Sequence, residues 1–169
     1  PFCESLCTYC GCNKRITRNH AVEDPYIESV LREWKLYVEL LPGRPVLREF
    51  HLGGGTPTFF SPQNLERLVS TILQDVDVPG ETEYGFEAHP GATSHEHLAT
   101  LRRLGFTRLS IGIQDFAPEI LEIINRRQSL EEVEQVTAWA RELGYQSINY
   151  DLIFGLPLQT PEHIRGAMK

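Results

Sequence analysis

Strand-like and helix-like segments alternate along this chain, and the alternation restricts its fold more than any other feature. Four short segments are expected to be strands: 46–52, 83–87, 108–114 and 147–154. Apolar spacing, Ser-Pro or Thr-Pro starts and glycine ends predict helices at 26–41, 61–76, 95–104, 118–125 and 130–143 and from residue 160. A strand followed by a helix, four times over with short linkers, predicts parallel strands joined by helical crossovers.

Doubly wound sheets and (β/α) barrels both fit this alternation, and the polar residues help to distinguish them. Polar or glycine-rich groups stand at or near the ends of four successive strands: 53–56, Glu87, Gln114 and Asp151. Barrel enzymes place their chemistry at several strand ends, whereas an open sheet concentrates it at one switch point. We therefore expect an α/β fold, a partial (β/α) barrel with outer helices, in one domain that covers residues 1–169.

All four cysteines lie within the first twelve residues. Cys3, Cys7 and Cys10 form a C-x3-C-x2-C run, and Cys12 follows two residues later. Thiolate is the soft ligand that iron–sulfur clusters require, and a short loop can wrap three thiolates around one cluster. Three ligands on a four-iron cube leave one iron free to bind another molecule. The run therefore predicts a 4Fe-4S cluster held by Cys3, Cys7 and Cys10, and the role of Cys12 stays open.

Three other uses of clustered cysteines fit less well. Disulfides in small secreted domains are spread along the chain, whereas these four cysteines are crowded together. A structural zinc site usually pairs two separate ligand knuckles, and this chain has no second knuckle, since its six histidines are scattered. The bacterial ferredoxin run has a different order of spacers.

A glycine-rich turn, Gly53-Gly54-Gly55-Thr56-Pro57, lies between a predicted strand and a predicted helix. Glycines there let a ligand approach the backbone closely. The turn lacks the Gly-Lys-Ser/Thr of a Walker loop and is not a G-x-G-x-x-G motif, so phosphate is not the first choice. The amino or carboxylate group of an amino-acid-like cofactor suits it better, and a tight structural turn is the alternative.

Four single residues could belong to a site at the strand ends. Glu87 could accept hydrogen bonds from a ribose diol, and Gln114 lies at the next strand end. Asp151 interrupts an apolar strand, where burying a carboxylate costs free energy unless the group is paired. Arg126 belongs either to the site or to a solvated helix end.

Lys14, Arg15 and Arg18 follow the cysteines in a chain whose formal net charge is −7. They are either a solvated charge run or contacts for an anionic substrate, because arginine pairs with carboxylate through two hydrogen bonds. The overall negative charge argues against broad nucleic-acid binding.

The composition predicts a globular protein in a reducing compartment. No apolar run approaches the roughly 18 residues that a membrane helix needs, and free thiols point to the cytoplasm. The chain opens at Pro1 without a methionine and closes on a helix pattern that looks unfinished. We therefore expect it to be a piece of a longer protein and to be inactive by itself.

The cysteine run and the GGGTP strand end together resemble the radical S-adenosylmethionine (SAM) superfamily. Further motifs narrow the resemblance to the oxygen-independent coproporphyrinogen III oxidase (dehydrogenase) family: 1–3, 12–14, 53–57, 113–116, 125–126 and 151–157. The chain starts too late to show the lead-in before Pro-Phe-Cys, lacks the family's later strands, and has His89 where many members have Asp.

The resemblance implies that SAM binds the open iron of the cluster and is cleaved by one electron to a 5′-deoxyadenosyl radical. The radical begins the oxidative decarboxylation of coproporphyrinogen III to protoporphyrinogen IX in haem biosynthesis. Eight residues match family positions that line the sites for one or two SAM molecules: Tyr9, Gly54, Gly55, Thr56, Glu87, Gln114, Arg126 and Asp151. The resemblance also implies an electron donor of unknown identity and a monomer.

Two rival functions remain open on the sequence alone. A haem chaperone of the same superfamily would share the cluster loop and GGGTP, and Glu87-Ala88-His89-Pro90-Gly91 looks similar to such chaperones. However, these relatives typically carry an aromatic residue at position 12 and Gln-Ser-Phe in place of Gln114-Asp115-Phe116. A purely structural metal domain would leave Asp151 and the glycine turn unexplained.

Overall fold

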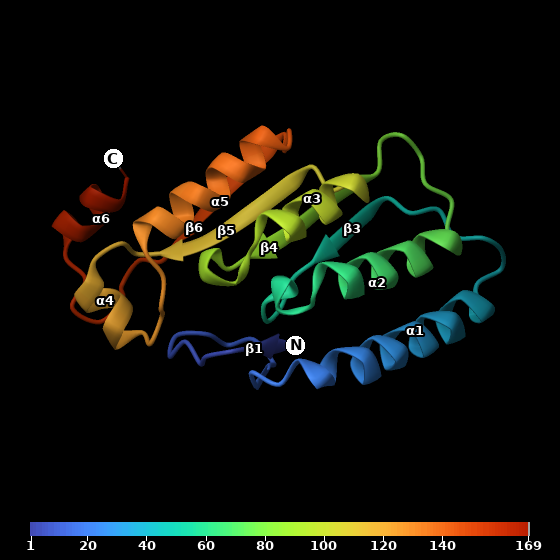
Figure 1. The fold of residues 1–169 in the computed structure, drawn as a ribbon, viewed down its shortest axis with the longest axis horizontal. Coiled ribbons are helices and arrows are strands. Elements are labelled where there is room, and N and C mark those ends of the chain that lie inside the picture. The colour runs from blue at the N-terminus through green and yellow to red at the C-terminus, as the bar shows by residue number, and fades with distance from the viewer. Residues whose placement is uncertain (169) are drawn as a thin grey trace.

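The computed structural model describes residues 1–168, with six strands and six α-helices (Figure 1). The four strands and six helices expected from the sequence occur in the expected order, and two short strands near the N-terminus were not predicted. The strands are β1 (Phe2–Cys3), β2 (Arg15–Ile16), β3 (Glu49–Leu52), β4 (Glu83–Ala88), β5 (Arg108–Gln114) and β6 (Ser147–Leu152). The α-helices are α1 (Glu23–Leu40), α2 (Pro62–Gln74), α3 (His95–Arg103), α4 (Pro118–Ile123), α5 (Leu130–Glu142) and α6 (Pro161–Ala167). Short 3-10 turns are η1 (His20–Val22), η2 (Pro57–Phe59) and η3 (Pro90–Ala92).

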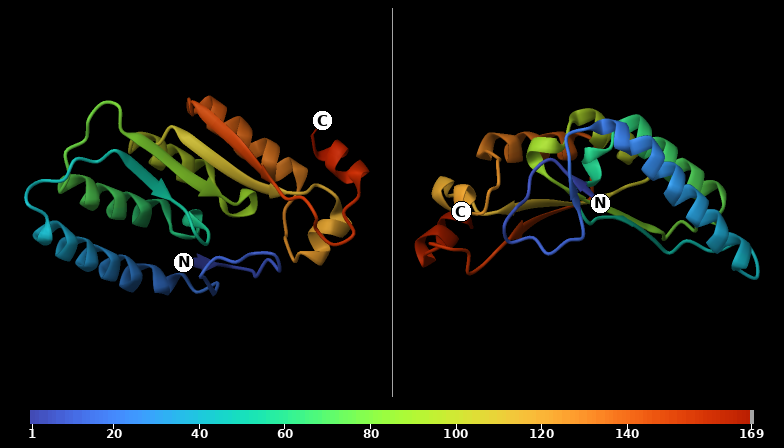
Figure 2. Two further views of the ribbon diagram at one scale, coloured as in Figure 1. Left: turned by 180° about the vertical axis from the view of Figure 1, so that it is seen from behind. Right: turned by 90° about the horizontal axis from the view of Figure 1, so that it is seen from below.

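The main sheet has four parallel strands in chain order, β3-β4-β5-β6, and a separate parallel pair joins β1 to β2. Helices α1, α2, α3 and α5 lie on one face of the sheet, and the cysteine loop crosses near its carboxyl end (Figure 2). Among residues 1–168 no helix covers the other face, as a doubly wound sheet would require. The α/β fold with parallel strands is confirmed, and the one-sided helices are those of a partial barrel.

Alternation of side chains along the strands produces an apolar face and a polar face. Tyr84, Phe86 and Ala88 of β4 are buried against the helices, whereas Glu83 and Glu87 are exposed on the opposite face. Successive side chains of a strand point to opposite faces, so every second residue shares a face. The polar residues of all four strands therefore face the side where the cysteine loop lies.

The expected boundaries agree with the structure to within three residues, and the differences at the start of β3 and the end of β6 have a physical cause. The strand expected from residue 46 begins only at Glu49, because Val46 forms a single isolated bridge with Asp77. The strand expected to reach residue 154 ends at Leu152, and Gly155 has φ +82°. A strand lasts only as far as its neighbour offers backbone partners.

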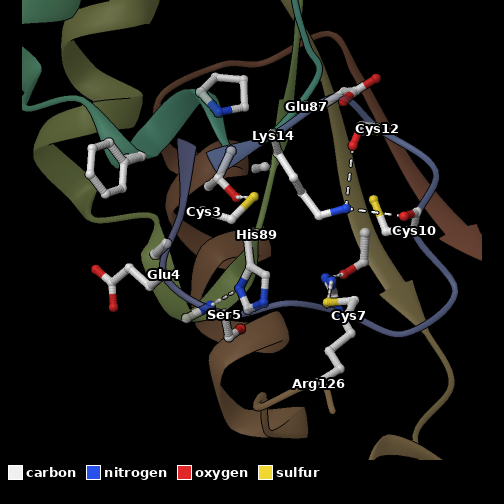
Figure 3. Close-up of a pocket in the computed structure, with 18 of the residues that line it drawn as sticks. Cys3, Glu4, Ser5, Cys7, Cys10, Cys12, Lys14, Glu87, His89 and Arg126 are labelled. Carbon is white, nitrogen blue, oxygen red and sulfur yellow. Dashed lines mark hydrogen bonds between the residues drawn. The ribbon is translucent and has the colours of Figure 1, made fainter. Parts of the chain in front are cut away.

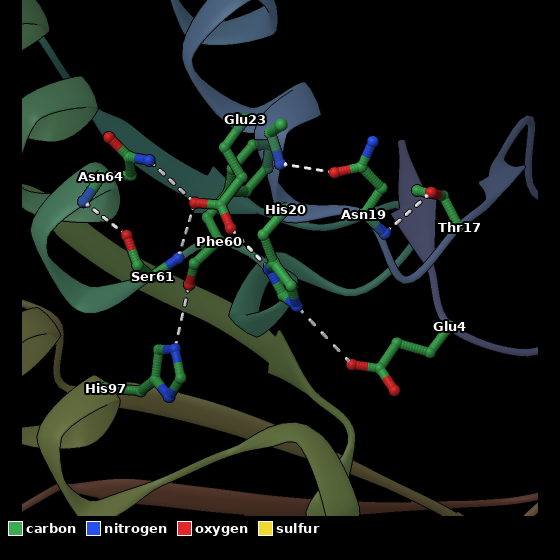
Figure 4. A network of polar contacts seen from close by, with 10 residues as sticks. Glu4, Thr17, Asn19, His20, Glu23, Phe60, Ser61, Asn64 and His97 are labelled. Carbon is green, nitrogen blue, oxygen red and sulfur yellow. Dashed lines mark hydrogen bonds and ion pairs between the residues drawn. The ribbon is translucent and has the colours of Figure 1, made fainter.

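A buried carboxylate ties the start of α1 to the start of α2 (Figure 4). Glu23 is 3% exposed, and it faces His20 Nδ1 at 2.7 Å and accepts hydrogen bonds from the backbone N–H of Ser61 and from Asn64 Nδ2. Although burial raises the pKa of Glu23, these hydrogen bonds hold it below the ordinary value. His20 also stacks on Phe59, with ring centroids 4.6 Å apart. The network fixes the chain between the cysteine loop and the sheet.

None of the helices within residues 1–168 combines the length and the hydropathy needed to cross a membrane.

Candidate functional site

A cavity of about 430 Å³ lies where the cysteine loop meets the carboxyl ends of the strands (Figure 3). This volume falls within the range of small-molecule sites. Every site residue predicted from the sequence lines it except Arg15: Cys3, Cys7, Tyr9, Cys10, Cys12, Lys14, Arg18, Gly54, Gly55, Thr56, Glu87, Gln114, Arg126 and Asp151. Residues from both ends of the chain are thus brought together at one place.

The first part of the cysteine loop is held against the glycine turn. The backbone N–H of Thr56 donates to the carbonyl oxygen of Phe2 at 2.9 Å, and Thr17 N–H donates to that of Cys3 at 2.9 Å. A Cβ atom at position 55 would stand 2.6 Å from the Phe2 oxygen. Glycine is therefore required at position 55, because a larger residue would push away the strand that carries Cys3.

The second part of the loop is held by the end of α4. Thr8 N–H donates to the carbonyl oxygen of Ile124 at 3.0 Å, and Asn125 Nδ2 donates to that of Leu6 at 2.7 Å. Asn125 has φ 52°, the left-handed conformation that ends a helix. The loop is thus fastened on two sides, and a cluster bound to it would be held rigidly against the sheet.

The three cysteines of the run have free thiols and separate polar neighbours. Cys3 Sγ lies 3.4 Å from Thr56 Oγ1, Arg126 Nη1 donates to Cys7 Sγ at 3.8 Å, and Lys14 Nζ donates to the Cys10 carbonyl at 3.0 Å. All three line the same cavity, and a cube takes one thiolate per iron, so this donor set fits an iron–sulfur cluster.

Cys10 and Cys12 differ in acidity. Burial raises the pKa of Cys10, but hydrogen bonds from the Cys12 backbone and from Lys14 outweigh burial and leave the Cys10 pKa below its ordinary value. The side-chain hydrogen bond with Cys10 raises the pKa of Cys12.

Two carboxylates reach the cavity from the polar face of the sheet. Glu87 of β4 accepts from the backbone N–H of Gly54 at 3.2 Å. Asp151 of β6 accepts from the Ser110 hydroxyl through both oxygens, at 3.0 and 2.9 Å. The sequence placed Asp151 inside an apolar strand, but it is exposed on the polar face and paired, so its charge remains hydrated.

Arg126 is buried between β5 and the cysteine loop, so the alternative prediction that it belongs to a solvated helix end is wrong. It is 8% exposed and donates to the carbonyl of Gly112, to Gln128 Oε1 at 2.7 Å and to Tyr9 Oη at 3.2 Å. A Cβ atom at position 112 would stand 3.1 Å from Arg126 Nη2. The guanidinium therefore joins β5 to the cysteine loop and needs a glycine beside it.

Gln114 ends β5 in a special conformation. It has φ 70°, and the pairing of β5 with β6 shifts between Gly112 and Gln114. A bulge of this kind re-aims a side chain next to a site. Gln114 is thereby placed among the residues that line the cavity.

The three cations behind the cysteines have different positions. Lys14 Nζ donates to the backbone carbonyls of Cys10 and Cys12, so it supports the loop. Arg15 is exposed on β2 and lies outside the cavity lining. Arg18 lines the cavity and is the cation of the three whose place best suits an anionic substrate.

Three contributors to the site were not predicted from the sequence. Ser110 could have been found, since it shares a face of β5 with Gly112 and Gln114 at alternate positions. Gln128 carries no sequence signal. His89 lines the cavity, its Nδ1 accepts from Gly91 N–H at 3.2 Å, and burial and the Arg126 charge lower its pKa to about 4.

The whole chain, residues 1–169, matches the family model described as the radical SAM superfamily. It is 41% identical over 164 residues to the oxygen-independent coproporphyrinogen III oxidase of Pseudomonas aeruginosa, and the alignment covers 96% of this chain and 36% of that protein. It is 38% identical over 169 residues to the Escherichia coli protein of the same name, and the alignment covers 100% of this chain and 37% of that protein.

Solved structures of radical SAM enzymes also resemble this chain. Coproporphyrinogen III oxidase from Escherichia coli, described as a radical SAM enzyme, superposes with a TM-score of 0.93 at 38% identity, over 99% of this chain and 38% of that one. The radical S-adenosylmethionine methyltransferase TsrM from Kitasatospora setae superposes with a TM-score of 0.63 at 16% identity, over 98% and 32%, and shows a likeness of fold alone. This chain spans 36% and 37% of the length of the two curated relatives.

Proposed function

Because this chain belongs to the radical SAM superfamily, we propose that it is the core domain of an oxygen-independent coproporphyrinogen III oxidase. One observation carries the proposal: the thiols of the C-x3-C-x2-C run line the same cavity as the polar ends of four parallel strands. Identities of 41% and 38% to oxidases of that name support the substrate. The domain covers residues 1–169 of a longer protein, and the oxidoreductase activity is that of the longer protein.

The cysteine loop holds the cluster. Cys3, Cys7 and Cys10 would each supply one thiolate to a 4Fe-4S cluster, which would leave one iron available for SAM. The contacts to Thr56 and Arg126 then hold the ligand side chains in place. When bound, the cluster would supply the electron that cleaves SAM, and SAM would supply the radical that removes hydrogen from the substrate. The protein's own work is to bind, orient and exclude water.

The strand ends hold SAM. The backbone carbonyls of Gly54 and Gly55 are open to the amino group of the amino-acid part, and Thr56 lines the cavity beside them. Glu87 and Asp151 accept hydrogen bonds from hydroxyl groups. The amide of Gln114 can donate as well as accept. Burial raises the pKa of Tyr9 to about 12, so its hydroxyl stays protonated and can donate. Arg126 keeps Tyr9 and Cys7 in place, and one or two SAM molecules bind among these residues.

The remaining parts of the proposal concern substrate and setting. Arg18, which lines the cavity, provides positive charge for the propionates of coproporphyrinogen III. A separate electron donor reduces the cluster, and the protein acts as a monomer in the cytoplasm, where thiols stay reduced. The function requires neither nucleic acid nor a membrane.

The test is the SAM-dependent conversion of coproporphyrinogen III by the longer protein, reconstituted with iron and sulfide without air. We expect protoporphyrin fluorescence after oxidation of the product, a strict need for SAM and a strong reductant, and loss of product in Cys7→Ala. A protein that loads its cluster and cleaves SAM, yet binds haem and forms no vinyl product, would contradict the oxidase and indicate the haem chaperone.

A further inference from the structure

His51 of β3 faces the carboxylate of Glu87 on the polar side of the sheet. Its Nε2 atom lies 3.7 Å from Glu87 Oε1, while the backbone N–H of Gly54 donates to Glu87 Oε2 at 3.2 Å. Each carboxylate oxygen therefore has its own protein neighbour, and both neighbours come from the same strand end. The two side chains are about half exposed, 47% for His51 and 48% for Glu87.

Two glycines make room for this pair. A Cβ atom at position 53 would stand 3.0 Å from His51 Nε2 and 3.1 Å from Glu87 Oε1. A Cβ atom at position 85, the partner of His51 across the strands, would stand 3.4 Å from His51 Nδ1. The separations at position 53 are tighter than ordinary van der Waals contact, and the one at position 85 is at its lower limit. The imidazole thus lies over backbone that carries no side chain on either strand.

We propose that His51 is a positioning residue that fixes the orientation of Glu87 for SAM. The inference rests on the function proposed above, in which Glu87 binds that cofactor. A half-exposed glutamate otherwise loses rotamer freedom when a ligand binds, and this loss weakens binding. The imidazole beside Oε1 limits the positions open to the carboxylate, and Gly54 N–H donates to Oε2, so together they hold the carboxylate beforehand, in the manner of outer-shell groups that orient a ligand-binding side chain.

The experiment measures the dissociation constant of SAM by equilibrium dialysis. It uses the longer protein with its cluster loaded and oxidised, so that no turnover occurs. His51→Leu removes the polar ring beside Glu87, and we expect binding about 3- to 10-fold weaker. His51→Gln restores a polar side chain at this position and should recover most of the affinity. Glu49→Gln changes a polar residue on the same face of β3, outside the cavity lining, and should have no effect.

A double-mutant cycle separates positioning from a general structural role. In a Glu87→Gln background, His51→Leu should weaken SAM binding by less than twofold, because the carboxylate that it orients is gone. In Gly53→Ala, the new methyl group lies between the two side chains, and SAM binding should weaken as much as it does in His51→Leu. Thermal unfolding and iron content of each variant, which should match the unsubstituted protein, show that the fold and cluster are intact.

The outcomes distinguish this inference from the proposed function. If the unsubstituted protein binds SAM and Glu87→Gln weakens binding, but His51→Leu does not, His51 is not a positioning residue. Equal losses from His51→Leu with and without Glu87→Gln would also overturn the inference. If the unsubstituted, cluster-loaded protein fails to bind SAM, the proposed function itself is wrong.

Discussion

Gly55 lies so close to Phe2 that a Cβ atom at position 55 would stand 2.6 Å from the Phe2 carbonyl oxygen. That oxygen also accepts the backbone hydrogen bond from Thr56. The contact joins the glycine turn after β3 to the strand that carries Cys3. Two sequence motifs that stand some fifty residues apart are therefore parts of one structure.

Gly55→Ala should destabilise the protein and reduce its cluster content. The new methyl group meets backbone rather than a flexible side chain, so β1 must move and the Thr56 hydrogen bond must lengthen. Overpacking of this kind costs about 1 to 3 kcal/mol. The measurement is iron per protein after reconstitution together with urea unfolding. Gly11→Ala is the control, since nothing lies within 4 Å of its Cβ position, and equal results for the two variants would contradict the account.

Arg126→Lys should be destabilising although it keeps the positive charge. The planar fork reaches Gly112, Gln128 and Tyr9 at once, and a lysine ammonium cannot satisfy all three from a buried position. We expect a loss of about 2 to 4 kcal/mol in the free energy of unfolding.

The matched control for this change is the neighbouring Arg127→Lys, because Arg127 is exposed. It should alter stability by less than about 0.5 kcal/mol. Chemical denaturation of both variants is the measurement. An Arg126→Lys protein as stable as the control would show that the buried fork does not hold the loop to β5.

Glu23→Ala should weaken the connection between α1 and α2. It leaves Ser61 N–H and Asn64 Nδ2 without their buried acceptor and His20 without its partner. Removing one member of such a network costs about 2 to 4 kcal/mol. Glu28→Ala, on the exposed part of the same helix, should cost less than about 1 kcal/mol. Thermal unfolding compares the two, and similar midpoints would show that the network is not stabilising.

His89 should make stability depend on pH between pH 6.5 and about 4. Burial, with the nearby charge of Arg126, lowers the His89 pKa from 6.5 to about 4, so the unfolded chain binds a proton that the folded chain does not. The stabilising contribution is fully present above pH 6.5 and is lost as the pH falls towards 4. The loss amounts to up to about 3 kcal/mol.

His89→Asn provides the comparison, because asparagine can accept from the Gly91 N–H and does not titrate. The difference in unfolding free energy between the two proteins, measured at pH 7.5 and pH 5 without the cluster, should change as the histidine titrates. A difference that is the same at both pH values would contradict the assignment.

The sequence could predict the order of elements because caps, glycine stops and apolar spacing are local signals. It could also predict that the strand ends carry the site, because parallel strands bring their carboxyl ends to one edge. The start of β3 was missed because it depends on where β4 offers partners, and Glu49 pairs with Glu83, the first residue of β4.

Side-chain contacts between neighbouring strands could not be predicted from the sequence either, because they depend on how the strands pair. The pairing of Asp151 with Ser110 and of His51 with Glu87 depends on the register of adjacent strands. The burial of Arg126 depends on how the segment after α4 turns back under β5. Asp151 looked anomalous within an apolar run, yet it lies on the polar face of the sheet that alternation produces.

In the proposed function, three thiolates hold a cluster whose open iron binds SAM. The most direct measurement is the electron paramagnetic resonance spectrum of the reduced, reconstituted protein with and without SAM. We predict a 4Fe-4S signal that changes when SAM is added, is retained in Cys12→Ala and is lost in Cys7→Ala. A cluster spectrum that SAM leaves unchanged, or one that survives Cys7→Ala, would contradict the account.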